Sequence, residues 1–237
     1  MIARFPFRQL CVVSLVFATM TTASAMAADI LSLDADWKQL DVPGRPAAEI
    51  SLRDDDLVRL VSSGGVSFFY RPLRIPESDR LTARWRWRAE GNFSPSDLTR
   101  QGGDDRPLAL HLWFDQPDSS EMLFGTLARA YGYPRVTHVL TYVFGGDGQG
   151  GALFANPYFP GGAVMVLRAG DMANGVWLEE NRDLQADIRR ALDGQVEPDH
   201  LRFIALSVDN DDLGGQSTGE IRGLHLGPDS ADPGSRR

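Results

Sequence analysis

Residues 81–89 read LTARWRWRA, a stretch in which apolar and polar side chains alternate at every position. Successive side chains of a β-strand point to opposite faces, so this period of two predicts a strand with one buried and one solvent-facing side. Two tryptophans share the apolar face, and the opposite face carries Arg84, Arg86 and Arg88. The stretch therefore predicts a half-buried β-strand that presents a row of three arginines.

Similar runs recur along the chain, separated by turn residues. The predicted strands are 49–53, 57–62, 66–73, 81–89, 108–114, 137–144, 163–167, 202–208 and 220–226. Residues 63–65, Ser-Gly-Gly, predict a tight hairpin, and residues 145–151 predict a flexible glycine-rich connection.

Two segments break this rhythm and predict short helices. Asp118 and Glu121 form a capping box for a helix that Gly132 can close. The second predicted helix is 182–192, with Gly194 as its left-handed cap. Many strands and two short helices predict an all-β fold, an antiparallel β-sandwich of two sheets packed face to face.

The N-terminus has the three parts of a secretory signal peptide. Arg4 and Arg8 precede the apolar run 10–18, and small residues follow as far as Ala27. We expect residues 1–27 to be cleaved before Ala28, which makes the protein periplasmic or secreted. The apolar run has about half the length of a membrane-spanning helix, so we predict no membrane insertion.

Cleavage removes Cys11, the only cysteine, and so excludes disulfides, cysteine nucleophiles and Cys-ligated metals from the mature chain. We expect residues 28–226 to form a single domain and residues 227–237 a disordered tail. The formal charge of −8 becomes −10 after two arginines are lost, which disfavours nucleic acid as a partner. No cofactor is predicted, and the sequence does not specify the oligomeric state.

The arginine row has two interpretations. In the first, nearby carboxylates pair with it internally. In the second, the row lines a sheet face and binds an anionic or polyhydroxyl ligand, because planar guanidinium groups make bidentate contacts. The candidate ligand-binding residues are Arg84, Arg86, Asp105, Tyr142, Arg182, Asp187 and Asp209.

Asp104 and Asp105 follow two glycines and precede a predicted strand. Adjacent residues entering a strand point in opposite directions, so the pair does not suit an acid and base acting on one bond. Asp105 can act in catalysis only with a distant carboxylate, such as Asp187 or Asp209. The alternative is a turn whose aspartates cap backbone amides.

Residues 209–214 read DNDDLG and approximate a calcium loop, with Glu220 beyond. Leu213 breaks the pattern, and the flanking strands exclude an EF-hand. Asp209 and Asp211 remain candidate calcium ligands, and the alternative is a polar hairpin loop.

No other catalytic signature stands out. The histidines are not spaced as metal ligands, and His111 and His138 lie in predicted strands, where packing or a single hydrogen bond is expected.

Several segments, taken in order, resemble the bacterial domain of unknown function 3047 (DUF3047). They are the strand around residues 84–87, residues 103–105 leading into 108–114, and residues 140–144, 156–157, 175–177, 180–187 and 207–211. The resemblance implies an exported β-sandwich similar to jelly-roll, galactose-binding-like and carbohydrate-binding modules. The family carries no established activity.

Three hypotheses about function follow. The first is a non-catalytic periplasmic module that binds a carbohydrate or another polar envelope ligand. The second is a glycan hydrolase or lyase with Asp105 and either Asp187 or Asp209 as acid and base. The third is a structural envelope protein whose arginines and aspartates form an internal network.

Overall fold

The computed structural model describes residues 36–53, 56–75, 81–92, 96–120, 132–170 and 174–228. The strands are β1 (Lys38–Asp41), β2 (Glu49–Arg53), β3 (Leu57–Ser63), β4 (Val66–Pro72), β5 (Leu81–Asn92), β6 (Arg106–Phe114), β7 (His138–Phe144), β8 (Leu153–Ala155), β9 (Gly162–Arg168), β10 (Leu178–Asp183), β11 (Leu201–Asp209) and β12 (Gln216–Pro228). The helical elements are α1 (Leu184–Leu192) and the 3-10 turn η2 (Pro198–His200).

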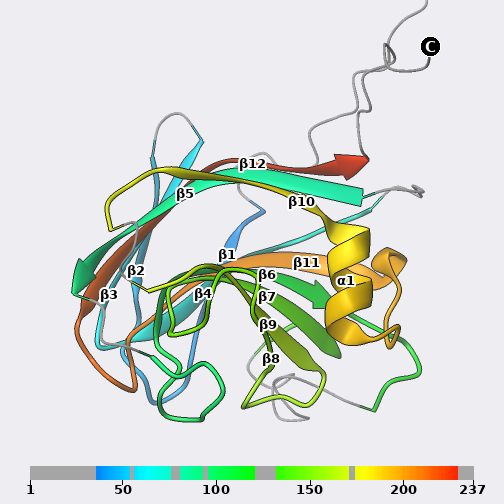
Figure 1. Cartoon of the computed structure of the whole chain (residues 1–237), viewed down its shortest axis with the longest axis horizontal. Coiled ribbons are helices and arrows are strands. Elements are labelled where there is room, and N and C mark those ends of the chain that lie inside the picture. Colours follow the sequence, from blue (N-terminus) through cyan, green and yellow to red (C-terminus); the bar gives the residue numbers. More distant parts are fainter. Residues whose placement is uncertain are drawn as a thin grey trace, which may run out of the picture.

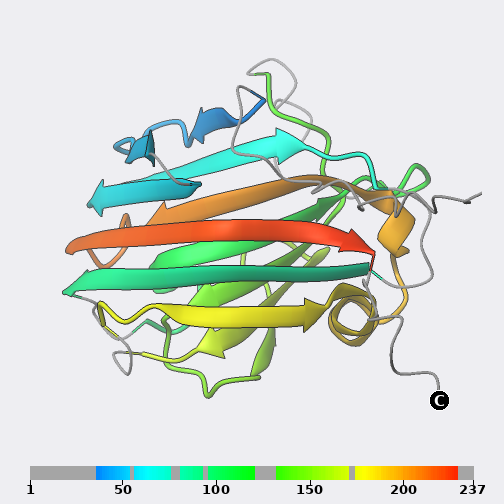
Figure 2. The same ribbon diagram turned by 90° about the horizontal axis from the view of Figure 1, so that it is seen from above.

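The strands form two sheets that lie one above the other (Figure 1). The lower sheet has seven strands in the order β1-β4-β11-β6-β7-β9-β8, and the upper has five in the order β10-β5-β12-β3-β2. Seen from above, β10, β5 and β12 lie side by side, with α1 at the end of β10 (Figure 2). The predicted β-sandwich is confirmed, and all nine predicted strands are present.

The main core lies between the two sheets and contains the tryptophans of residues 81–89. Trp85 and Trp87 are 1% and 0% exposed. The ring centroids of Trp85 and Tyr142 are 5.7 Å apart, and those of Trp87 and Phe144 are 5.5 Å apart; Tyr142 and Phe144 belong to β7 of the opposite sheet. The alternation along β5 therefore places its aromatic face inside and its arginine face outside.

One strand pair departs from the predicted antiparallel arrangement, because β7 and β9 run parallel. The chain leaves β7, runs to the edge strand β8 and returns as β9 between the two, so β9 is antiparallel to β8. The connection after β7 is packed in place: Gly145 has φ +116°, and a Cβ there would lie 2.6 Å from Cδ of Pro107. The prediction of a flexible connection is wrong for this part of it, since Gly145 N also donates to Arg168 O at 2.7 Å.

The predicted hairpin at residues 63–65, and the connection for which a hairpin loop was the alternative to a calcium site, are instead crossings from one sheet to the other. Residues 63–65 join β3 of the five-stranded sheet to β4 of the seven-stranded sheet, and residues 210–215 join β11 to β12. The turn chemistry was predicted correctly, since Gly64 has φ +70° and Ser62 Oγ donates to Gly65 O at 2.7 Å. A local turn signal does not specify which sheet the following strand joins.

Helix α1 begins two residues later than predicted, because Asp183 is its N-cap and accepts from Ala186 N at 3.0 Å. Arg182 belongs to β10, a strand that the sequence did not predict; β1 and β8 were also missed. The left-handed C-cap is Asp193 (φ 47°), and Gly194 also has positive φ.

Other predictions concern residues that the structure does not describe. The helix predicted from Asp118 falls mostly on residues 121–131, and this segment, the predicted signal peptide (residues 1–27) and residues 229–237 lie outside the described residues. Strand β12 continues to Pro228, two residues into the predicted tail. In the described ranges, no helix has the length and apolar character that a membrane span requires.

Candidate functional site

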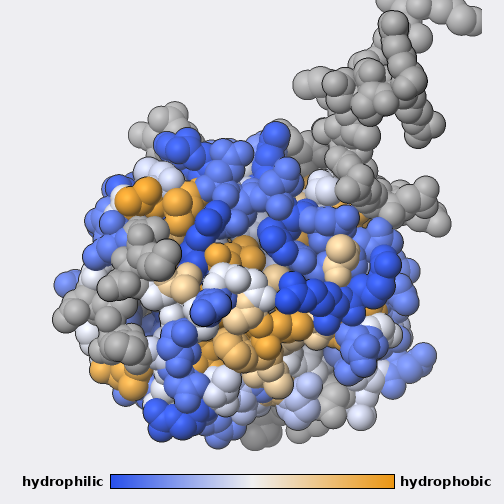
Figure 3. Space-filling view, viewed as in Figure 1, coloured by the Kyte–Doolittle hydropathy of each residue, from blue (hydrophilic) through white to orange (hydrophobic). Residues whose placement is uncertain are grey.

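The outer face of the five-stranded sheet carries the arginine row. Across β5, Arg86 lies opposite Glu179 on β10 and Arg222 on β12. Arg84 lies opposite Asn181 on one side and His225 on the other. Three strands therefore contribute side chains to one solvent-facing surface. Hydrophilic residues cover most of the upper layer in the space-filling view (Figure 3).

A β-bulge brings His225 onto this face. The register between β12 and β5 shifts between Arg222 and His225, and Gly223 lies in the shift with φ +60°. A bulge adds one residue to one strand of a pair. It lets Leu224 point into the core at 6% exposure while Arg222 and His225 both face outward. A regular strand would instead place Leu224 on the same face as Arg222.

The two ends of the arginine row differ in their partners. Arg88 Nε contacts Glu220 Oε2 at 2.5 Å, and Arg88 Nη1 contacts Glu90 Oε1 at 3.0 Å. Arg59 Nη1 contacts the other Glu220 oxygen at 3.0 Å. Carboxylates therefore neutralise this end of the row, but they are glutamates and not the aspartates of the internal-network hypothesis. The pKa of Arg88 is raised by its hydrogen bond with Glu220.

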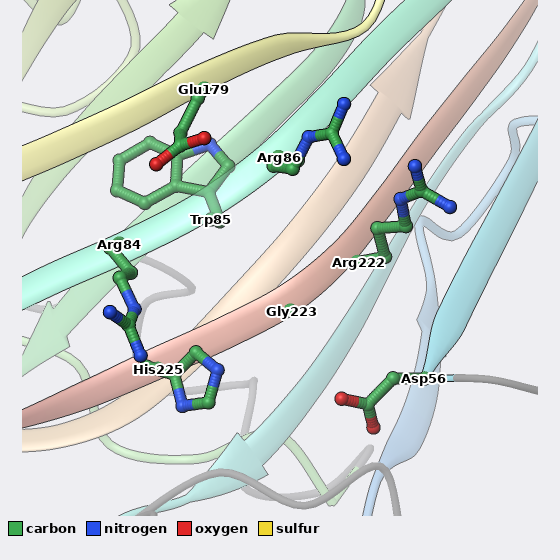
Figure 4. Close-up of a pocket in the computed structure, with 8 residues that line it drawn as sticks. All are labelled: Asp56, Arg84, Trp85, Arg86, Glu179, Arg222, Gly223 and His225. Carbon is green, nitrogen blue, oxygen red and sulfur yellow. The ribbon is translucent and has the colours of Figure 1, made fainter.

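Arg84, Arg86 and Arg222 have no ion pair within the part of the chain that the structure describes. They line a cleft of about 330 Å³ together with Asp56, Trp85, Glu179, Gly223 and His225. Figure 4 shows Arg84 beside His225 at one end and Arg86 and Arg222 at the other, with Asp56 at the side. Their guanidinium groups are therefore available to a ligand.

An aromatic ring stands beside this cleft. Trp177 lies just before β10. Its ring centroid is 4.4 Å from the guanidinium carbon of Arg222 and 6.0 Å from that of Arg86. The loop that carries it is held to β5, because Gly175 N donates to Ala89 O at 2.7 Å. Cations at this distance from a tryptophan ring are attracted to its face. The half-buried ring therefore positions two of the three arginines that line the cleft.

Three other predicted site residues form a separate network at the end of the sandwich near α1. Arg182 Nε and Nη2 donate to the two oxygens of Asp187 at 2.8 and 2.7 Å, and Tyr142 Oη donates to Asp187 Oδ2 at 2.9 Å. Tyr142 is fully buried and Asp187 is 6% exposed. Burial, with Asp187 alongside, raises the pKa of Tyr142 well above its usual value. This network anchors the helix to the sheets and does not face the cleft.

The remaining two, Asp105 and Asp209, lie at the opposite end. Asp105 accepts from the backbone N–H of Asp212 and Leu213 at 3.1 and 2.8 Å, so the amide-capping alternative is correct for it. Asp209 Oδ2 lies 3.4 Å from Arg106 Nη2. Burial is the main cause that raises the pKa of both carboxyl groups.

Of the predicted ligand-binding residues, Arg84 and Arg86 line this cleft. The structure adds Trp177, Glu179, Arg222 and His225, which sequence reasoning missed. The missing information was strand pairing: Arg222 and His225 lie in a predicted strand, but only the register with β5 brings them beside Arg84 and Arg86.

Solved structures with a similar fold include carbohydrate-active proteins. The xyloglucanase domain of NopAA, a type three effector from Sinorhizobium fredii in complex with cellobiose, has a TM-score of 0.44 and 9% identity over 80% of this chain and 92% of that one. A family 12 xyloglucanase from Bacillus licheniformis has a TM-score of 0.40 and 10% identity over 85% and 90%. TmCBM61 in complex with β-1,4-galactotriose has a TM-score of 0.34 and 10% identity over 81% and 88%. Likeness this distant assigns no activity or ligand to the chain.

A search of the curated proteins gives no match to the sequence. Residues 35–225, most of the chain, match the family described as "Protein of unknown function (DUF3047)". The resemblance seen in the sequence motifs is thus confirmed, and the chain belongs to the DUF3047 family.

Proposed function

We propose that the protein is a non-catalytic binding module for an acidic glycan, which occupies the cleft on the outer face of the five-stranded sheet. One observation carries the proposal: Arg84, Arg86 and Arg222 surround an open cleft without an ion pair among the described residues. The formal charge of the whole chain is −8, so acids are abundant, yet none of those described contacts these guanidinium groups. An anionic ligand would supply the missing partner.

The cleft also has groups that suit a sugar ring. Guanidinium groups bind carboxylates with two parallel hydrogen bonds, and Glu179 and Asp56 offer acceptors for hydroxyl groups. Trp177 adds an aromatic surface at the edge. Donors for a carboxylate, acceptors for hydroxyls and one ring together match a polyhydroxylated anion better than an inorganic anion.

The geometry does not favour the hydrolase or lyase hypothesis with Asp105 and Asp187 as acid and base. Asp187 belongs to α1, whereas Asp105 contacts the connection between β11 and β12 at the other end of the sandwich (Figure 1). An acid and base must flank one bond within about 10 Å of each other. Asp187 is also held by Arg182 and Tyr142, which leaves it no free face for a substrate.

Calorimetric titration of the mature protein with oligogalacturonate tests the proposal, and an uncharged oligosaccharide of the same length is the parallel titrant. We expect binding of the acidic oligomer only, and each of Arg84→Gln and Arg86→Gln should weaken it about tenfold, the effect of one charged hydrogen bond. Arg189→Gln is the matched control, because Arg189 is an exposed arginine on α1 far from the cleft.

Two results would refute the proposal. One is equal binding of the acidic and uncharged oligomers, which would remove the role of the arginines. The other is release of shorter products from the acidic oligomer, with rates reduced by the cleft variants, which would make the protein an enzyme. Higher salt should weaken binding, because the contacts are ionic and exposed.

We also propose that the protein works outside the cytoplasm, on the basis of the signal-like residues 1–27. N-terminal sequencing of the protein from the periplasmic or secreted fraction should give Ala28 as the first residue. Full-length protein in the cytoplasmic fraction would refute this part.

A further inference from the structure

Three connections meet at the end of the sandwich away from α1. Asp105 ends the loop before β6, Asp209 ends β11, and Asp211 lies two residues further on. The antiparallel register of β11 and β6 pairs Asp209 with Arg106, which brings Asp105 to the same place. Asn210 N donates to Gly65 O at 3.0 Å, so this loop is also tied to the turn after β3.

The loop between β11 and β12 bends back around Asp105. The Asp105 carboxylate accepts from the backbone N–H of Asp212 and Leu213, which carries Asp211 toward Asp209. Asp105, Asp209 and Asp211 each present a carboxylate oxygen within 4.8 Å of the other two. Two oxygens bound to one Ca²⁺ at about 2.4 Å lie at most about 5 Å apart, so this spacing fits ligands of a single cation.

The acids of this region outnumber the bases that touch them. Arg106 contacts Asp104 at 2.6 Å and Asp209 at 3.4 Å. Arg45 contacts Asp211 at 2.9 Å and Asp212 at 3.4 Å. Two guanidinium groups thus face five carboxylates, counting Asp105. Like charges this close in a partly desolvated site destabilise the fold unless a cation or a proton is added.

A second observation points to a ligand. Asp209 is 7% exposed, and its Oδ1 is fully buried with no hydrogen-bond partner in the described part of the chain. Leaving a buried carboxylate oxygen unsatisfied is costly. This residue belongs to the group of three converging carboxylates.

We propose that Asp105, Asp209 and Asp211 bind one hard divalent cation of the Ca²⁺ or Mg²⁺ class, which ties together the connections before β6 and after β11. Carboxylate oxygens are the ligands that these ions prefer, and no histidine or cysteine belongs to the group. Ca²⁺ accepts a wider range of ligand arrangements than octahedral Mg²⁺, so Ca²⁺ is the first ion to test. The site is independent of the proposed glycan cleft.

The site differs from the sequence-based calcium hypothesis in its ligands. Asp209 and Asp211 keep the role suggested by residues 209–214, and Asp105 joins them from a segment about a hundred residues earlier. Glu220, which completes the loop pattern in the sequence, lies on the outer face of β12, where Arg88 and Arg59 bind it.

The test uses the mature protein, treated with EDTA and then dialysed into metal-free buffer. Calorimetric titration and thermal unfolding are followed with CaCl₂ and, separately, MgCl₂. We expect Ca²⁺ to bind with one site per chain and to raise the Tm by about 5 °C or more at saturation. Mg²⁺ should give a smaller shift, and a larger one than Ca²⁺ would assign the site to Mg²⁺.

Asp209→Asn should abolish the Ca²⁺-induced shift, and Asp211→Asn should weaken binding about tenfold or more. Asp212→Asn is the matched control on the same loop, because Asp212 is outside the group of three and should leave the shift intact. If Asp209→Asn fails to fold, Asp211→Asn is the second ligand variant that decides the matter; the Asp211 side chain is 11% exposed.

The proposal would be overturned if neither ion, at concentrations up to about 10 mM, gave a heat of binding or a shift in Tm. This concentration exceeds the Kd of the weakest extracellular calcium sites. A Tm in EDTA that rises with Asp209→Asn, with no metal effect on the unchanged protein, would show a shared proton in place of a cation. Loss of glycan binding in Arg84→Gln with the Ca²⁺ shift retained keeps the two proposals separate.

Discussion

Arg84 and Arg182 were predicted to serve one site, yet the structure gives them opposite roles. Arg182 makes two hydrogen bonds to the buried Asp187, which also accepts from Tyr142. Arg84 is exposed, lines the open cleft and has no ion pair among the described residues. The neighbours that a sheet brings together, and not the residue type, decide whether an arginine stabilises the fold or is available to a ligand.

Strand register explains the difference. Arg182 lies opposite Ala83, on the face of the sheet that points toward the core, whereas Arg84 lies opposite Asn181 on the solvent face. Two of the three inward positions of β10, Glu180 and Arg182, are charged, and both are paired. Glu180 accepts from Trp87 Nε1 at 2.9 Å and Arg168 Nε at 2.6 Å. Charges on the inner side are satisfied within the protein, as burial requires.

The largest effect is expected from removing the centre of the inner network. Asp187→Ala should lower the free energy of unfolding by about 3 kcal/mol, because it leaves Arg182 and the Tyr142 hydroxyl without their partner. Urea unfolding followed by tryptophan fluorescence measures the change, with Arg189→Ala as the control on the same helix. A loss below about 1 kcal/mol, the value of an exposed pair, would show that the network does not anchor α1.

The second prediction concerns another inner polar group, His111. Its Nε2 lies 2.8 Å from Ser207 Oγ and its Nδ1 lies 3.0 Å from Thr141 Oγ1. Burial, and then the charge of Arg106, lower the pKa of His111 well below 6.5. The unfolded chain therefore takes up a proton as pH falls below about 6.5 while the native state does not, so stability falls by up to about 1.4 kcal/mol per pH unit.

Unfolding free energies of the unchanged protein and of His111→Gln, measured between pH 7.5 and 5.5, check this. The difference in unfolding free energy between the unchanged protein and the variant should decrease as pH falls, because the variant lacks the histidine that causes the acid sensitivity. Parallel curves would contradict the prediction.

A smaller effect is expected for Tyr142→Phe. The change removes one hydrogen bond to Asp187 and leaves both bonds from Arg182, so the loss should be about 1 kcal/mol. Denaturant unfolding of Tyr142→Phe, of Asp187→Ala and of the double variant measures the loss in unfolding free energy. The double variant should lose less than the sum of the losses of the two single variants. Full additivity would show that the two residues act independently.

The smallest effect is expected at the cleft. Replacing both Arg84 and Arg86 by Gln should change the unfolding free energy by less than about 0.5 kcal/mol, since neither makes an ion pair in the described structure. Unfolding curves beside those of Arg182→Gln make the comparison direct. A loss above about 2 kcal/mol would place the cleft arginines in the structural class and remove the basis for the proposed glycan site.

The sequence by itself determined the features that depend on near neighbours along the chain. Alternation in residues 81–89 determined which side chains of β5 are buried, and the pattern of residues 182–192 predicted α1, although the helix begins at Leu184 and its left-handed cap is Asp193. These patterns are readable because strand geometry repeats every two residues and helix geometry every 3.6. Strand existence was therefore predictable for nine of the twelve strands.

Only the tertiary structure decided which strands are neighbours. It placed β9 parallel to β7, made the predicted hairpin at residues 63–65 a crossing between sheets, and made β10 the edge strand beside β5. The candidate sites depend on these pairings: Arg222 reaches Arg86 through the register of β12, and Asp105 reaches Asp209 through that of β6 and β11. The physical reason is that pairing joins segments up to about 165 residues apart through backbone hydrogen bonds, which every sequence can form and no local pattern specifies.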